Sequence, residues 1–282
     1  MEEAVQINLE EKKLYGILHI PENTGLPEKI ILMVVGGPQT RIGSHRLYVD
    51  LARWLTTKGH YVFRFDYEGI GDSEGVWKGY KYSSASITEA INFLVNKYSS
   101  LTKVFIWSLC DGSTASMIYG AGNSDRVHGM ILCNPYVHSA TDEARALLKH
   151  YYIRRIFSKY FWRKIVSFKF NFFESIKSMS DIVQKSYSPD QINPDESQME
   201  IDPVEMIDSL KKYPHKVIFI LSDNDLTAKK FYDFINREPS LRKNAKRKNI
   251  MYRHVPGADH TFTKSRAKKE LLRITTESIH LL

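Results

Sequence analysis

Residue types that together carry out acyl transfer occur along this chain in the order thiol, carboxylate, imidazole, at Cys110, Asp225 and His260. A thiolate attacks an acyl carbonyl, an imidazole moves the proton, and a carboxylate holds the imidazole in orientation. Each of the three closely follows an apolar run that is typical of a strand. Three ordered matches are an improbable coincidence, and they predict a covalent acyl-enzyme reaction.

The segment around Cys110 has the pattern of a nucleophile elbow. An apolar run, Val104–Trp107, leads into a turn and then a helix of small residues. The usual pattern is Gly-x-Ser-x-Gly, and here it reads Ser108-x-Cys110-x-Gly112, so the predicted nucleophile is a thiol. The alternative for a lone cysteine after a strand is buried packing, which is the interpretation we adopt for Cys133.

Two carboxylates compete for the role of the acid. Asp223 and Asp225 both follow the apolar run 217–221 and precede a predicted helix. Asp225 stands immediately before that helix, where it would also serve as its N-cap. The residue pattern alone leaves both open.

An oxyanion formed during the reaction needs backbone donors. The N–H of Asp111 follows the nucleophile, and the turn after the apolar run 30–35 offers Gly37, whereas Pro38 has no N–H to donate. The side chain of Asp111 has three open roles: capping the following helix, orienting a substrate donor, or orienting His260.

The remaining pattern predicts the scaffold that positions these residues. β-type runs alternate with helical periodicity after an opening hairpin, which indicates a mostly parallel sheet with helices on both faces, an α/β fold. Residues 1–134 and 214–282 form the predicted core, and residues 135–213 an inserted helical lid over the carboxyl ends of the strands. The expected strands after the hairpin span residues 30–35, 61–65, 104–107, 127–133, 217–221 and 250–255.

Composition limits the function classes. The chain has 282 residues, 43% hydrophobic and 26% charged, with a formal net charge of +8. Its basic runs belong to no nucleic-acid motif, so we expect no nucleic-acid partner. It has no apolar run of bilayer length and no secretory signal, and its two cysteines are too few for a disulfide framework, which favours the cytoplasm.

The predicted lid contains an amphipathic helix between residues 152 and 163. Phe157 and Phe161 lie on its apolar face, where we expect them to roof the acyl pocket. Arg154, Arg155 and Lys159 lie largely opposite. The competing interpretation is a weak contact of this basic face with an anionic membrane surface.

Taken together, the motifs resemble the α/β hydrolases, and in particular the first of the hydrolase families associated with the bacterial exosortase A and exopolysaccharide system. The resemblance implies an α/β-hydrolase fold and a Cys-His-Asp site. It favours Asp225 over Asp223, because Ser222-x-x-Asp225 falls where these hydrolases have Gly-x-x-Asp, and it aligns Gly37 with their oxyanion turn. Ser108 and Asp223 depart from the family pattern. The motifs that carry the resemblance are Val34–Gln39 with Gly43–Arg46, Arg64–Tyr67 with Gly71–Gly75, Ser108–Asp111, Phe161–Lys164, Asp225–Ala228 and Ala258–Phe262.

The sequence therefore predicts a Cys-dependent hydrolase or acyltransferase that acts on a small ester or thioester without metal or organic cofactor. The rival hypothesis is a non-catalytic protein of the same fold that assists polysaccharide assembly. Retention of all three site residues favours the enzyme. The sequence does not specify the substrate or the oligomeric state.

Overall fold

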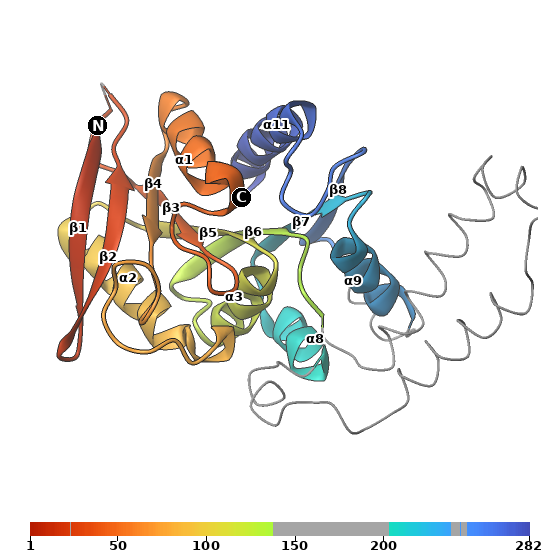
Figure 1. Ribbon diagram of the computed structural model, residues 1–282, viewed down its shortest axis with the longest axis horizontal. Helices are drawn as coiled ribbons and strands as arrows, with labels where there is room; N and C mark the ends of the chain where they lie inside the picture. Colours follow the sequence, from red (N-terminus) through yellow and green to blue (C-terminus); the bar gives the residue numbers. More distant parts are fainter. Residues whose placement is uncertain (23, 138–202, 238–242, 244–246) are drawn as a thin grey trace, which may run out of the picture. The chain divides into compact units, whose positions relative to one another are not determined.

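A single sheet of eight strands organises the part of the chain that the computed structural model describes, which is residues 1–22, 24–137, 203–237, 243 and 247–282 (Figure 1). The strand order across the sheet is β1-β2-β4-β3-β5-β6-β7-β8. The strands are β1 (Glu2–Leu9), β2 (Lys12–His19), β3 (Lys29–Val34), β4 (Tyr61–Phe65), β5 (Lys103–Leu109), β6 (Val127–Cys133), β7 (Lys216–Ser222) and β8 (Ile250–Val255).

Burial along the strands explains their sequence patterns. The hairpin β1–β2 is antiparallel and joins β4 in antiparallel register, while all pairs from β4 to β8 are parallel. The central strands β3, β5, β6 and β7 are buried along almost their whole length, as their continuous apolar runs predict. Exposed and buried side chains alternate along β1, as expected for an edge strand with one solvent-exposed face.

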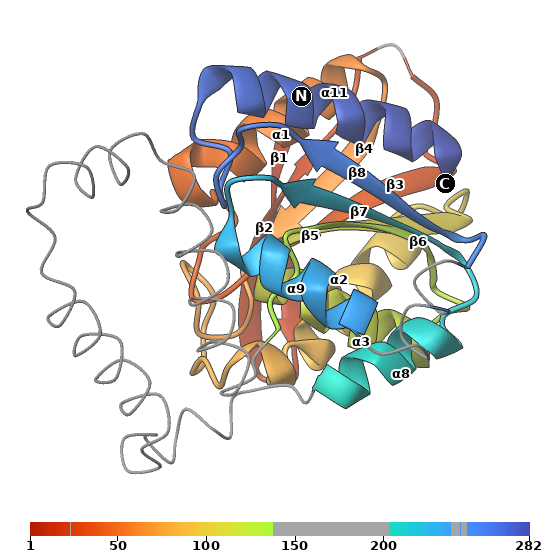
Figure 2. The same cartoon turned by 90° about the vertical axis from the view of Figure 1, so that its right-hand side faces the viewer.

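Helices cover both faces of this sheet. Figure 2 shows α1 and α11 side by side on one face, and α2, α3, α8 and α9 on the other. This three-layer arrangement confirms the predicted α/β-hydrolase fold. The helices are α1 (Leu47–Thr57), α2 (Ser84–Lys97), α3 (Asp111–Gly122), α8 (Pro203–Lys212), α9 (Leu226–Arg237) and α11 (Ser265–Leu281), with short 3-10 helices at Ser44–Arg46 and Tyr80–Tyr82.

The parallel strands set the place of the site. Because β3, β5, β6, β7 and β8 run in the same direction, the segments that follow them emerge at one edge of the sheet. Gly36, Cys110, Asn134, Asp225 and His260 all lie in these segments. Ligands of parallel sheets bind at this edge.

The predicted insertion, residues 135–213, falls mostly outside the described residues. Phe157, Phe161 and the basic residues Arg154, Arg155 and Lys159 lie there. The described chain before residue 138 and after residue 200 forms one unit, in which α8 packs on α3. No helix in the described portion is long and apolar enough to cross a membrane.

Candidate active site

The turn between β5 and α3 has the strained backbone of a nucleophile elbow. Cys110 adopts φ 61° and ψ −133°, which is rare for a residue with a side chain. Its N–H donates to the carbonyl of Cys133 at 3.0 Å, and its own carbonyl accepts from the N–H of Ser113 at 3.0 Å. The turn therefore forms with Ser108 in place of the usual glycine. Ser108 and Ser113 are fully buried, whereas Cys110 is partly exposed at the apex of this turn.

Two glycines allow the turn after β3 to contact the start of α3. A Cβ atom at Gly36 would lie 2.5 Å from the carbonyl oxygen of Leu109, and one at Gly112 would lie 2.6 Å from that of Val35. Both distances are shorter than van der Waals contact, so only glycine fits at these positions. The close approach places the turn that carries Gly37 beside Cys110 and Asp111.

Asp225 and His260 form a hydrogen bond across the loops after β7 and β8. His260 Nδ1 lies 2.8 Å from Asp225 Oδ2. The same carboxylate accepts the backbone N–H groups of Thr227 and Ala228, each at 3.1 Å, and so caps α9. Orientation of the imidazole and helix capping, which the sequence left as alternatives, are both performed by Asp225.

Asp223 contacts a different histidine. Its Oδ1 lies 3.2 Å from Nδ1 of His254, and both side chains are about half exposed. Asp223 is thus the second carboxylate of the loop, but its described partner is not the histidine that faces Cys110.

The third member of the constellation, Cys110, interacts with the imidazole of His260 and raises its pKa. Because Nδ1 of His260 is bonded to Asp225, the contact with Cys110 is made by Nε2. Burial, the largest influence, lowers the pKa of His260, but the bonds to Asp225 and Cys110 outweigh it and raise that pKa to about 10. The structure therefore favours the protonated imidazole for His260, which lies between the carboxyl of Asp225 and the side chain of Cys110.

The side chain of Asn134 hydrogen bonds to both of the segments that lead to Asp225 and His260. It is fully buried at the end of β6, with φ 42°. Its Nδ2 donates to the backbone oxygen of His260 and to Ser222 Oγ, each at 2.9 Å, and its Oδ1 accepts the N–H of Ser222 at 2.8 Å. Asn134 was not predicted to have this role, and its one sequence signal is that an asparagine directly follows a buried strand.

The carboxyl of Asp111 lies beside the predicted oxyanion donors. It accepts the N–H of Gly112 at 3.0 Å, and the N–H groups of Gly37 and of Asp111 itself interact with it and lower its pKa. Burial raises the pKa of Asp111 to about 6, against the opposing effect of these N–H bonds. Of the roles left open for Asp111, the bond from Gly112 corresponds to capping of α3.

A buried ion pair anchors the loop that follows Gly37. Arg41 contacts the fully buried carboxylate of Asp66 and, on its other side, Asp72. Gly71 approaches Asp66 so closely that a Cβ atom would lie 2.3 Å from Oδ2. The Asp66, Gly71 and Asp72 motif thus fixes the loop that carries the candidate oxyanion donor. Sequence analysis quoted the motif but missed its partner, Arg41.

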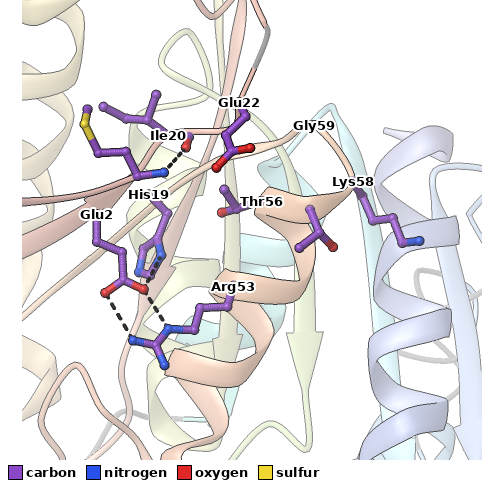
Figure 3. Close-up of a pocket in the computed structure, with 10 residues that line it drawn as sticks. Glu2, His19, Ile20, Glu22, Arg53, Thr56, Lys58 and Gly59 are labelled. Atoms are coloured by element: carbon purple, nitrogen blue, oxygen red, sulfur yellow. Dashed lines mark hydrogen bonds and ion pairs between the residues drawn. The ribbon is translucent and has the colours of Figure 1, made fainter.

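A separate pocket of about 720 Å³ lies near the amino end of β4, between β1, β2 and the end of α1 (Figure 3). Glu2 occupies the space between His19 and Arg53, with its Oε1 3.6 Å from His19 Nδ1 and 2.6 Å from Arg53 Nε. Beneath it, Arg64 Nε donates to His19 Nε2 at 2.8 Å. No residue that the sequence proposed for catalysis lines this pocket.

Comparison with known proteins gives the class of the molecule. The fold and the elbow are those of an α/β hydrolase, and residues 27–273 match the family described as serine aminopeptidase, S33. The chain belongs to this family and is a hydrolase. Comparison with the curated proteins finds no match.

Solved structures share the fold at low sequence identity. An esterase of Pyrococcus furiosus is similar with a TM-score of 0.65 and 14% identity, over 98% of this chain and 89% of that one. Est1E from Butyrivibrio proteoclasticus, solved with bound ferulic acid, has a TM-score of 0.63 and 18% identity over 98% and 100%. A proline iminopeptidase of Mycobacterium smegmatis has 0.62 and 14% over 99% and 98%.

The family description names a serine, whereas the elbow of this chain carries Cys110. The family match therefore supports hydrolysis without deciding the nucleophile, and the exosortase-associated subfamily is not among the findings. Within the ranges that the structure describes, no cluster of His, Cys, Asp or Glu is arranged to hold a metal ion.

Proposed function

We propose that this protein is a cysteine hydrolase that cleaves an ester or a thioester through an acyl-enzyme on Cys110. The observation that carries the proposal is the contact of Cys110, at the strained apex of the elbow, with His260, whose Nδ1 lies 2.8 Å from Asp225 Oδ2. The other cysteine, Cys133, is fully buried.

The proposed reaction begins with a Cys110 thiolate beside a protonated His260. The Cys110 thiolate attacks the acyl carbon, the π electrons move to the carbonyl oxygen, and the backbone N–H groups of Asp111 and Gly37 bind the resulting oxyanion. The intermediate collapses, His260 gives its proton to the departing alkoxide or thiolate, and an acyl-enzyme remains. Neutral His260 then accepts a proton from water, which attacks the acyl carbon, and collapse of the second intermediate expels the thiolate.

A pKa of about 10 for His260 suits a thiolate enzyme. An imidazolium is a ready proton donor for a leaving group, and Asp225 fixes the ring so that Nε2 faces the sulfur. Transfer of the acyl group to an acceptor other than water needs the same first half-reaction, so acyltransfer belongs to the same proposal.

The wider setting is also proposed. The motif resemblance supports a cytoplasmic enzyme with a small acyl substrate and a link to exopolysaccharide synthesis. In this proposal the part of the predicted insertion 135–213 that precedes α8 is a lid, with Phe157 and Phe161 as part of the acyl pocket and a basic face that contacts membranes weakly.

The test is turnover of a panel of acyl esters and thioesters by the wild type and by the Cys110→Ala and Cys110→Ser variants. We expect Cys110→Ala to lose turnover, by about 10⁴-fold or more, and the acyl-enzyme to be trapped on Cys110 by rapid acid quenching and mass measurement. Turnover by Cys110→Ala equal to wild type would overturn the proposal.

A further inference from the structure

The carboxyl of Asp111 occupies the position where the proposed reaction forms its oxyanion. It accepts the N–H of Gly112 at 3.0 Å. The N–H groups of Gly37 and of Asp111 itself, which are the two donors that the sequence predicts for the oxyanion hole, interact with this carboxyl and lower its pKa. Preorganised donors bind a transition-state oxygen only when that oxygen reaches them, and here the carboxyl of Asp111 already lies beside them.

The turn after β3 is shaped around this carboxyl. A Cβ atom at Gly36 would lie 2.4 Å from Asp111 Oδ1, and one at Gly37 would lie 3.5 Å from Oδ2. Helix capping explains a bond from Gly112, which lies in the same helix. Capping does not require a contact with Gly37, which follows a different strand. The contact between Asp111 and Gly37 therefore needs another explanation.

We propose that the Asp111 carboxyl is a tethered occupant of the oxyanion hole, which the substrate carbonyl displaces before Cys110 attacks, and that Asp111 thereby determines which acyl groups react. This inference rests on the proposed function. A carboxylate and an oxyanion compete for the same two N–H groups, and two negative oxygens at that distance repel each other.

The displaced carboxyl needs a new hydrogen-bond donor. Among the described residues, the charged and titratable groups that interact with it electrostatically are Tyr48, Tyr67 and His260, and Cys110 precedes it in the chain. The hydroxyl of Tyr67 already donates to the carbonyl of Val35 at 2.9 Å, and that of Tyr48 faces Val34 at 3.4 Å. The imidazole of His260 already interacts with Asp225 and Cys110.

Because these groups of the described residues are already engaged, the proposal assigns the new donor to the substrate. An acyl group with a hydroxyl or ammonium group one or two carbons from its carbonyl brings a donor within reach of a side chain as short as aspartate. A plain acyl chain leaves a part-buried carboxylate without a partner, which is unfavourable. Asp111 thus selects acyl groups that carry a hydrogen-bond donor beside the reacting carbonyl.

Two reagents distinguish an effect on the oxyanion hole from an effect on the reactivity of Cys110. Iodoacetamide alkylates a thiolate by displacement of iodide and forms no oxyanion. An alkyl trifluoromethyl ketone adds the thiolate to its carbonyl carbon, and the carbonyl oxygen becomes an oxyanion that must enter the hole. The ratio of ketone affinity to alkylation rate thus measures how well the oxyanion hole accepts an oxyanion. Changes in the reactivity of the thiolate affect both quantities and cancel in the ratio.

The measurement uses wild type, Asp111→Asn and Asp111→Ala. Asn removes the charge and keeps a side chain in the hole, and Ala empties it. We expect the ratio to rise by about tenfold or more in Asp111→Ala, with Asp111→Asn between the two. An equal ratio in all three proteins, or weaker ketone binding in Asp111→Ala, would overturn the inference. A folded wild type that reacts with neither reagent would instead overturn the proposed function.

A second arm tests substrate selection. Wild type should prefer the p-nitrophenyl ester of a hydroxybutyrate over that of butyrate in kcat/KM, and Asp111→Ala should lose this preference mainly by a gain on plain butyrate. A preference that is unchanged in both variants would contradict a selective role of Asp111, and the Asn variant keeps this arm informative should the Ala variant fold poorly.

Discussion

Two histidines of this molecule lie in polar clusters at different places on the sheet, and their protonation is opposite. His19, 1% exposed, has the Nε–H of Arg64 on its Nε2, and burial together with Arg64 lowers its pKa to about 4. His260 is also largely enclosed, and burial likewise lowers its pKa, but its bonds to Asp225 and Cys110 prevail and raise it to about 10.

The difference comes from the partners and not from burial. A cation on one ring nitrogen leaves His19 neutral, and its remaining neighbour Glu2 is shared with Arg53. An acid on one side and a thiol on the other leave His260 charged and able to exchange a proton. The pocket beside His19 has a volume of about 720 Å³ and contains no cysteine (Figure 3). The edge with Cys110 instead brings a thiol, an imidazole and a carboxylate together.

The largest expected effect follows removal of the acid from this relay. Asp225→Asn should lower turnover by about 10³ to 10⁴-fold, because the Nδ1–H of His260 loses its charged acceptor. It should also move the alkaline limit of activity to lower pH, since Asp225 is one of the groups that raise the pKa of His260. Steady-state kinetics across pH measure both.

The matched control for this substitution is Asp223→Asn. Asp223 contacts the half-exposed His254, so we expect turnover within about threefold of wild type. Thermal unfolding should be similar in both variants, because asparagine also caps a helix well at position 225. Equal losses of turnover in the two variants would show that the acid is wrongly assigned.

A smaller effect is expected at Asn134, which positions the relay without touching substrate. Asn134→Gly removes the amide and tolerates the positive φ, so it isolates the hydrogen bonds to Ser222 and His260. We expect kcat to fall by about 10 to 100-fold, with a loss of stability of roughly 1–3 kcal/mol.

Ser222→Ala is the control for Asn134. It removes only the hydroxyl that accepts from Nδ2 and leaves the bonds to the His260 carbonyl and the Ser222 N–H. Its kcat should stay closer to wild type. A larger loss in Ser222→Ala than in Asn134→Gly would refute the positioning role of Asn134.

The smallest effect on activity is expected at the other histidine. His19→Gln should leave turnover nearly unchanged but alter the pH dependence of stability. The folded pKa of about 4 lies below the ordinary value of 6.5, so the unfolded chain binds more protons between these values. The contribution is therefore complete above about pH 6.5 and is lost as pH falls towards 4, amounting to about 2–3 kcal/mol.

Denaturant unfolding between pH 4 and 7 checks this prediction. Wild type should lose stability more steeply on acidification than His19→Gln. Identical slopes would mean that His19 does not titrate as its contact with Arg64 implies. A large loss of turnover in His19→Gln would show that the cluster around His19 also takes part in the reaction, contrary to this account.

Much of the fold could be predicted because apolar runs bounded by turns specify buried strands locally. β3, β6 and β7 are of this kind, and the elbow follows from the small residues around Cys110. Asn134 could not be assigned, because its partners lie 88 and 126 residues further along the chain. Side-chain direction decides the rest: Asp223 and Asp225 occupy one loop, and only the folded chain places one at His254 and the other at His260.

Asp111 illustrates the same limit within a single residue. The sequence predicts its N–H as an oxyanion donor, and that N–H is adjacent to Gly37 in the structure. The direction of its carboxyl depends on the turn after β3, about 75 residues earlier, where Gly36 leaves the necessary room. Local pattern therefore identifies the donor and gives no information on its occupant.

The most direct test of a cysteine nucleophile is the stoichiometry of alkylation by iodoacetamide in the native protein. Cys133 is an internal control, because it is fully buried and burial raises its thiol pKa well above the ordinary value. We predict one equivalent of label per chain, located at Cys110 by peptide mass mapping, with loss of turnover in proportion and no labelling of Cys110→Ala. A folded protein in which Cys110 stays unlabelled, or in which full labelling leaves turnover intact, would contradict the account.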